Sequence, residues 1–194
     1  MKSRLLPYIA ALITVALIAS LTLTLTRTPE AFEAPTVPHG MPADFTRVAE
    51  EISLQEFLEI AKENGFTVYL PTWLPDDMEL TAVWFKYGLY PIAIVVYDSH
   101  GEEDPYLAEF SIQIIPTPCL PVTPTEDSIV LEVNGWQVII KKAHLTVPRE
   151  IAKFGEYALV ADVYIDGVWY SICAPTLTVE EVIAIIQSMK PAEA

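Results

Sequence analysis

The first candidates for chemistry in this chain are two cysteines, which could form a disulfide bond or act as nucleophiles. Cys119 and Cys173 are the only cysteines in the sequence. In an exported protein they would lie where disulfide bonds persist, and a bridge closing a loop of about 55 residues would stabilise the fold by roughly 4 kcal/mol. Two buried thiols are the alternative, because the sequence does not show whether the two Cα atoms come within bridging distance. No His or Asn signature surrounds either residue, so we do not expect a cysteine nucleophile.

Carboxylates form the second group of candidates. The loop DSHGEEDP concentrates four of them, which are Asp98, Glu102, Glu103 and Asp104. Hard oxygen ligands at this density suit Ca²⁺, but their spacing does not fit a twelve-residue calcium loop. We therefore expect solvated turn residues and no metal cofactor, with these four as weak candidates. Asp76, Asp77 and Asp98 are the carboxylates on which a hydrolase would depend.

Other signatures of catalysis do not occur in the sequence. His39, His100 and His144 are isolated, without an HExxH motif or a second histidine at helical spacing. There is no Gly-x-Ser-x-Gly elbow, phosphate-binding glycine loop or dinucleotide fingerprint. The sequence thus predicts no cofactor and favours a protein that is not an enzyme.

Aromatic side chains give the best indication of binding. In the stretch ADVYIDGVWYSI, the turn Asp166-Gly167 sets Tyr164 and Trp169 opposite each other, beside Asp162. If Val163 and Tyr170 face the core, this group lies on the other face of the hairpin. A second layer would cover it, or it would remain exposed as a recognition patch.

Two tight hairpins position these residues. Asn134-Gly135 pairs Val133 with Trp136, Leu131 with Val138 and Ile129 with Ile140. Asp166-Gly167 pairs Ile165 with Val168, Val163 with Tyr170 and Ala161 with Ile172. Each turn therefore predicts the register of its own pair of strands.

Two amphipathic helices enclose the strands. The first follows a capping box of Ser53 and Glu56, and Gly65 marks its end. The second follows a capping box of Thr178 and Glu181, and its apolar stripe runs to Met189. Between them, LAEFSIQII alternates between apolar and polar residues and predicts a strand with one buried face and one wetter face. These elements predict an α+β domain with an antiparallel, curved sheet of about six or seven strands flanked by the two helices.

An uncharged apolar run stands before this domain. Residues 5–26, LLPYIAALITVALIASLTLTLT, would reach roughly 33 Å as a helix, enough to cross a hydrocarbon core of about 30 Å. Lys2 and Arg4 precede the run, which predicts a cytoplasmic N-terminus and an exported domain. The run is longer than a usual signal-peptide core and lacks a clean cleavage site, so we expect a retained anchor, with a cleaved signal peptide as the alternative.

These segments divide the chain into three parts. Residues 1–27 are the predicted membrane anchor, residues 28–49 a proline-rich stalk, and residues 50–190 the exported α+β domain. The net charge is −15, from 26 acidic and 11 basic residues, and every acidic residue follows Arg27. Such a charge repels nucleic acid and suits cations, basic partners or simple solubility.

Three stretches, FTVYLPTWLPDDMELTAVWF, ADVYIDGVWYSI and LTVEEVIAIIQSM, together resemble a known family. It is an uncharacterised family of exported prokaryotic domains with an LPtyLPegyel motif, some of which are attached to membrane anti-sigma-factor proteins. The resemblance covers roughly residues 50–190 and implies a sensing or accessory role in the cell envelope. It supplies no functional residue.

The sequence therefore favours a membrane-anchored, extracytoplasmic, non-enzymatic binding, sensing or accessory domain with a protein or envelope partner. Two other functions remain open at this point. One is a lipid or lipoprotein carrier with an apolar cavity, and the other is a carboxylate-dependent hydrolase. An apolar cavity would favour the carrier, and carboxylates converging in a cleft would favour the hydrolase.

Overall fold

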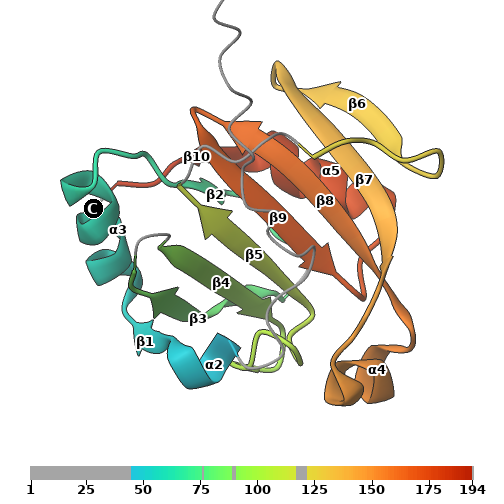
Figure 1. Cartoon of the computed structure of the whole chain (residues 1–194), viewed down its shortest axis with the longest axis horizontal. Helices are drawn as coiled ribbons and strands as arrows, with labels where there is room; N and C mark the ends of the chain where they lie inside the picture. The colour runs from blue at the N-terminus through green and yellow to red at the C-terminus, as the bar shows by residue number, and fades with distance from the viewer. Residues whose placement is uncertain (1–44, 76, 89–90, 117–121, 194) are drawn as a thin grey trace, which may run out of the picture. The chain divides into compact units, whose positions relative to one another are not determined.

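The computed structural model describes residues 45–75, 77–88, 91–116 and 122–193, and its main element is an antiparallel sheet (Figure 1). The eight strands lie in the order β1-β3-β4-β5-β9-β8-β7-β6. Their bounds are β1 Glu50–Ile52, β3 Glu79–Lys86, β4 Ile92–Asp98, β5 Phe110–Ile115, β6 Ile129–Val133, β7 Trp136–His144, β8 Tyr157–Ile165 and β9 Val168–Ala174. The predicted α+β class with an antiparallel sheet is confirmed, with slightly more strands than expected.

Four helices and a small second sheet complete the described part of the chain. The helices are α2 Phe45–Val48, α3 Leu54–Glu63, α4 Pro148–Phe154 and α5 Val179–Ser188. Strands β2 Tyr69–Pro71 and β10 Met189–Pro191 pair with each other. The two predicted helices are α3 and α5. Met189, expected at the end of the second helix, instead begins β10, because its backbone is extended.

Both hairpin registers agree with the prediction. Val133 pairs with Trp136 at the first turn, and Ile165 pairs with Val168 at the second. Asn134 and Asp166 have φ angles of 55° and 49°, and the glycine after each is also positive. These are the angles that a two-residue hairpin turn requires, which explains why the Asn-Gly and Asp-Gly pairs predict the register.

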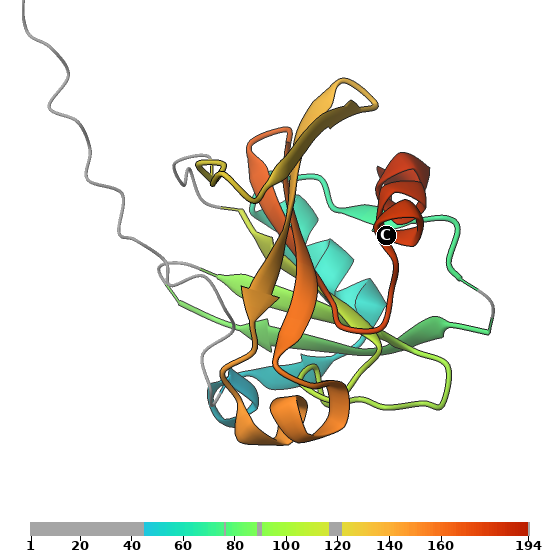
Figure 2. The ribbon, with the colours of Figure 1, turned by 90° about the vertical axis from the view of Figure 1, so that its right-hand side faces the viewer.

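One face of the sheet carries the main hydrophobic core. Helix α3 contributes Phe57 and Leu58, and helix α5 contributes Ile185 and Ile186. Figure 2 shows that the sheet bends, so that β3 and β4 run crosswise to β7 and β8, and that α3 and α5 lie on the inner side of the bend. The curvature predicted from the sequence therefore encloses two helices.

The other face is also buried, but it is not uniformly apolar. Over β3 and β4 a second cluster gathers around Phe45, Ile94, Val96 and Tyr106. Over β5 the outward residues are polar and still buried, with Ser111 3% and Gln113 9% exposed. The alternation expected for β5 is thus present, whereas the wetter face expected for it is covered.

The folded domain includes residues that were assigned to the stalk. Phe45, at the start of α2, is fully buried, and its N–H donates to the Tyr106 hydroxyl over 3.2 Å. The domain therefore reaches at least to Phe45. The predicted anchor lies outside the described residues. Within the described ranges, no helix combines the length and the apolar character that crossing a membrane requires.

Candidate functional site

Polar residues from neighbouring strands meet on the second face of the sheet. The register pairs Ser111 with Cys173 and Gln113 with Ser171 across β5 and β9. It then pairs Ser171 with Asp162 on β8. Cross-strand partners share a face and lie about 4.5 to 5.5 Å apart at Cβ. The centre of this face is therefore polar, between the apolar cluster over β3 and β4 on one side and β7 on the other.

A pocket opens over this polar centre. Its volume is about 90 Å³. Strands β5, β7, β8 and β9 form its floor, and its rim includes α4, the residues before α4, and Tyr106. The side chains that give it chemistry are Ser111, Gln113, Lys141, Glu150, Ser171 and Cys173, with the Trp169 ring beside them.

The predicted group of Tyr164, Trp169 and Asp162 is present, and Asp162 holds it together. Asp162 is 3% exposed, and its Oδ1 accepts a hydrogen bond of 3.1 Å from Trp169 Nε1. The Lys141 ammonium lies 3.2 Å from Asp162 Oδ2, which has no other partner in the described part of the chain. Trp169 pairs with Tyr164 as predicted and is 5% exposed. Of the two alternatives that the sequence left open, the Trp169 ring is covered and not exposed, and Asp162 serves to hold Trp169 and Lys141 in place.

Glu150 is the charged group of the pocket. It lies in α4 and is 6% exposed. Burial raises the pKa of its carboxyl to about 7, and the nearby Arg149 offsets this only in part. Arg149 is itself engaged, with Nη2 3.0 Å from Asp104 Oδ2 and its guanidinium over the Tyr106 ring. Glu150 thus makes no hydrogen bond or ion pair within the described residues.

Cys173 lies in the same pocket as a free thiol. Burial raises the pKa of this thiol to about 12, and the nearby Glu150 adds to the effect. A thiol is nucleophilic as its thiolate, so the raised pKa disfavours Cys173 as a nucleophile at neutral pH. Its predicted disulfide partner, Cys119, lies outside the described residues, so the bridge stays a prediction.

The four carboxylates of the acidic loop do not converge as metal ligands. Asp104 pairs with Arg149, Glu102 Oε1 accepts from the Asp104 N–H, and Glu103 is exposed. Asp98 is 1% exposed and accepts from the N–H groups of His100, Glu102 and Glu109.

Asp98 organises the loop. Burial alone would raise the pKa of Asp98, but these backbone donors and nearby Lys153 outweigh burial and lower it. Asp98 also lies with His100 and Glu109 in the one group of three possible metal ligands among the described residues. Because its oxygens already accept three hydrogen bonds, Asp98 explains the shape of the loop without an ion. Of the other hydrolase candidates, Asp76 is not described and Asp77 is exposed in a turn.

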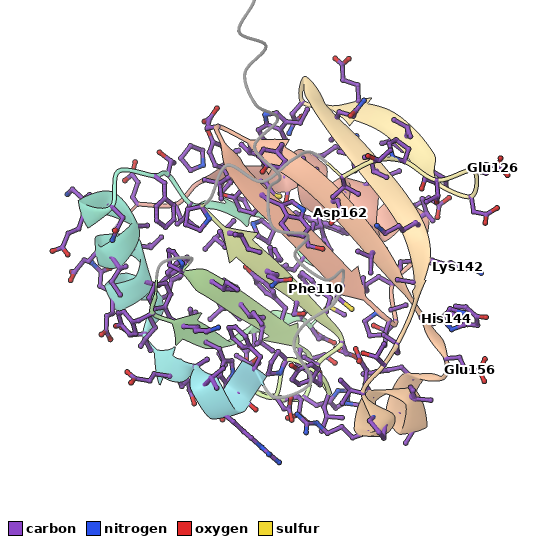
Figure 3. All side chains as sticks on the ribbon, in the orientation of Figure 1. Phe110, Glu126, Lys142, His144, Glu156 and Asp162 are labelled. Atoms are coloured by element: carbon purple, nitrogen blue, oxygen red, sulfur yellow. The ribbon has the colours of Figure 1, made fainter. Side chains whose placement is uncertain are left out.

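A second and larger groove, which includes Lys142, His144 and Tyr157, lies at the outer margin of the sheet. Figure 3 places Lys142, His144 and Glu156 along this margin, well away from Asp162. The His144 ring packs on Tyr157, with their centroids 4.2 Å apart. These side chains are exposed, in contrast to the buried polar groups of the pocket.

Comparison with known proteins identified no relative of this chain. No family model matches the chain, and no curated protein or solved structure is significantly similar to it. The resemblance to exported envelope domains therefore stays a prediction.

Several residues of the pocket were not singled out from the sequence. For Ser111 and Gln113 a signal existed, because the alternation in LAEFSIQII placed both opposite the apolar residues of the strand. For Ser171, the second hairpin placed it on the face of Asp162 and Trp169. For Glu150 there was no such signal, since only the tertiary fold brings α4 over this face.

Proposed function

We propose that this chain is a membrane-anchored, extracytoplasmic binding domain of the cell envelope, acting as a sensor or accessory subunit rather than as an enzyme. The observation that carries the proposal is the pocket on the second face of the sheet. Binding sites commonly combine an apolar wall with a few convergent polar groups. Here the Trp169 and Tyr106 rings stand beside Ser111, Gln113 and Glu150.

The other two functions expected from the sequence have less support. A lipid carrier needs a long apolar cavity, whereas α3 and α5 pack against the inner side of the curved sheet and the pocket on the second face has a volume of only about 90 Å³. A hydrolase needs a nucleophile next to a base, or carboxylates that converge on a substrate. The Cys173 thiol is protonated at neutral pH, and Asp98 is occupied by three backbone donors.

The place of the domain outside the membrane is supported by the sequence. The apolar run at residues 5–26 and the positive charges before it predict this orientation. A net charge of −15 on the chain is compatible with an exterior role and with cationic or basic ligands.

A thermal-shift screen of the full chain in mild detergent tests the binding function. We expect at least one class of small polar compound to raise the melting temperature of the wild type but not that of Gln113→Met, which removes the amide and keeps the side-chain length. Gln187→Met is the matched control, because Gln187 is exposed on α5 and should leave the response unchanged.

The partner is tested by crosslinking the protein in its own membranes, purifying it and identifying what comes with it by mass spectrometry. A stoichiometric membrane protein would support a sensor or accessory subunit. A protein without a partner that still binds a small molecule would support a separate binding protein. The absence of both a partner and a ligand would contradict the proposed function.

A further inference from the structure

The buried polar side chains of the domain fall into two groups. Among the described residues these are Asp98, Ser111, Gln113, Glu150 and Asp162. Asp98 and Asp162 are held by backbone N–H groups, Trp169 and Lys141. The other three make no side-chain hydrogen bond within the described residues, and all three line the pocket. Among the described residues, Asp162 Oδ2 is the only fully enclosed side-chain oxygen or nitrogen without a hydrogen bond. The polar atoms of Ser111, Gln113 and Glu150 therefore reach the pocket, where a bound molecule can pair with them.

The charge that Glu150 lacks is positive, and the cations that α4 and β7 place near it are engaged elsewhere. Lys153, on the same helix as Glu150, donates to the Leu107 carbonyl. Arg149, on the same helix, pairs with Asp104 in the segment before β5. Lys141, on β7, pairs with Asp162. The remaining titratable groups around the pocket are Tyr106 before β5, Cys173 on β9 and His144 at the end of β7.

We propose that the pocket binds a small free primary amine in its ammonium form, through an ion pair with the Glu150 carboxylate. This inference rests on the proposed binding function and names the class of its ligand. An ammonium group offers three N–H donors, and the hydroxyls of Ser111 and Ser171 and the amide oxygen of Gln113 line the same pocket as acceptors.

The walls and the size of the pocket narrow the ligand further. The Tyr106 and Trp169 rings line it, and aromatic faces attract cations. A volume of about 90 Å³ limits the ligand to a few non-hydrogen atoms. Methylammonium and ethylammonium are therefore the probes that match it.

Binding is coupled to a proton at Glu150. Burial raises the pKa of this carboxyl to about 7, so it is mostly protonated at pH 5.5 and mostly ionised at pH 8.5. The ammonium ion pairs with the ionised form, and binding at neutral pH therefore releases a proton. The ionised fraction rises by about thirtyfold over this range, and the affinity for the ammonium ion is expected to rise with it.

The experiment is calorimetric titration of the full chain in detergent, in an amine-free buffer, with methylammonium chloride and ethylammonium chloride. We expect saturable binding at pH 8.5, weaker by about thirtyfold at pH 5.5, and a loss of at least tenfold in Glu150→Gln. Glu103→Gln is the matched control, because Glu103 is exposed in the acidic loop, and it should bind as the wild type does.

Acetate and acetamide, titrated in parallel, separate the failure of this inference from failure of the proposed function. If acetate or acetamide binds and Gln113→Met abolishes that binding while neither ammonium ion binds, the ligand class is wrong and the binding function stands. Ammonium binding that is independent of pH and unchanged in Glu150→Gln also overturns the inference. If Glu150→Gln does not fold, two other measurements test the inference. Ammonium binding by the wild type should weaken at pH 5.5, and Ser171→Val should weaken it at pH 8.5. If no probe binds and no partner is found, the proposed function fails as well.

Discussion

At the scale of single residues, the second face of the sheet shows how buried polar groups differ in role. Asp162 is fully engaged and fixes two neighbours, Trp169 and Lys141. Glu150 is also buried, but it has no hydrogen-bonding or ion-pairing partner among the described residues. The first arrangement stabilises a structure, whereas the second leaves a group that a ligand can satisfy.

Truncation of Trp169 measures how much this structure depends on the buried ring. We expect Trp169→Ala to lower the free energy of unfolding by about 3 to 5 kcal/mol, because the ring is buried and its N–H is bonded to Asp162. Trp73 is 45% exposed, so Trp73→Ala should cost under about 1 kcal/mol. Urea denaturation of the full chain, followed by far-UV circular dichroism, compares the two. An equal, small loss in both would mean that Trp169 is a surface residue.

Glu150 makes stability depend on pH in a predictable direction. Its folded pKa, about 7, lies above its ordinary value of 4.5, so its favourable contribution is complete below pH 4.5 and is lost as the pH rises to 7. Glu150→Gln removes this dependence. In phosphate buffer without amines, we expect the variant to be more stable than the wild type by roughly 1 to 3 kcal/mol at pH 8.5 and nearly equal to it near pH 4.5. A difference that does not change with pH would contradict the burial of an ionisable carboxyl.

At the scale of elements, the N-termini of α3 and α5 have similar capping sequences but different hydrogen bonds. In α5, Thr178 Oγ1 accepts from the Glu181 N–H, and Glu181 Oε2 accepts from the Thr178 N–H over 2.7 Å. In α3, Ser53 Oγ accepts from the Glu56 N–H, and no return bond from Glu56 is present among the described residues. The first is a complete capping box and the second is half of one.

This difference predicts different responses to acid. The Thr178 backbone N–H and hydroxyl lower the pKa of Glu181, so its contribution is present above the ordinary Glu value and is lost as the pH falls through the lowered value. We expect Glu181→Gln to cost about 0.5 to 1 kcal/mol at pH 7, with the difference shrinking as the pH falls below the ordinary Glu value and through the lowered pKa of Glu181. Glu56→Gln is the matched control and should change stability little at either pH. Equal effects in the two variants, measured by thermal unfolding, would mean that the return bond contributes nothing.

Elements defined by local chemistry were predictable, and elements defined by packing were not. The two hairpins were correct in register because the backbone angles at Asn134 and Asp166 depend on the turn residues themselves. By contrast, α2 has four residues and α4 has seven, too few for an apolar stripe to become visible. Both are held by contacts distant in sequence, such as that between Phe45 and Tyr106.

The candidate site was predicted only in part, for the same reason. Asp162, Tyr164 and Trp169 were predicted because a single turn sets their positions. The pocket beside them needs α4 to bring Glu150 over strands that are up to about 40 residues away along the chain. Sequence patterns report the face of a strand but not what covers it, which is why the sequence placed Trp169 correctly but left open whether its ring is covered or exposed.

At the scale of the whole molecule, the two faces of the curved sheet have separate roles. The inner face packs on α3 and α5 and is entirely a hydrophobic core at its centre. The outer face carries a smaller apolar cluster and, next to it, the polar pocket. A ligand in that pocket would contact β5, β7 and β9 directly, and α4 at its rim. The pocket and the main core therefore lie on opposite faces of the sheet.

The anchor predicted at residues 5–26 would place the pocket on the outer side of the membrane. We expect the full chain to stay in the membrane pellet after alkaline carbonate extraction, because an uncharged helix of this length inserts stably. Protease added outside intact cells should digest the domain, because the positive charges before the run keep the N-terminus in the cytoplasm. Mass spectrometry of the purified protein tests whether the run is retained. A mature chain beginning near Thr28 or Thr36 would mean a cleaved signal peptide, and the pocket would then belong to a released binding protein instead of a membrane-tethered sensor.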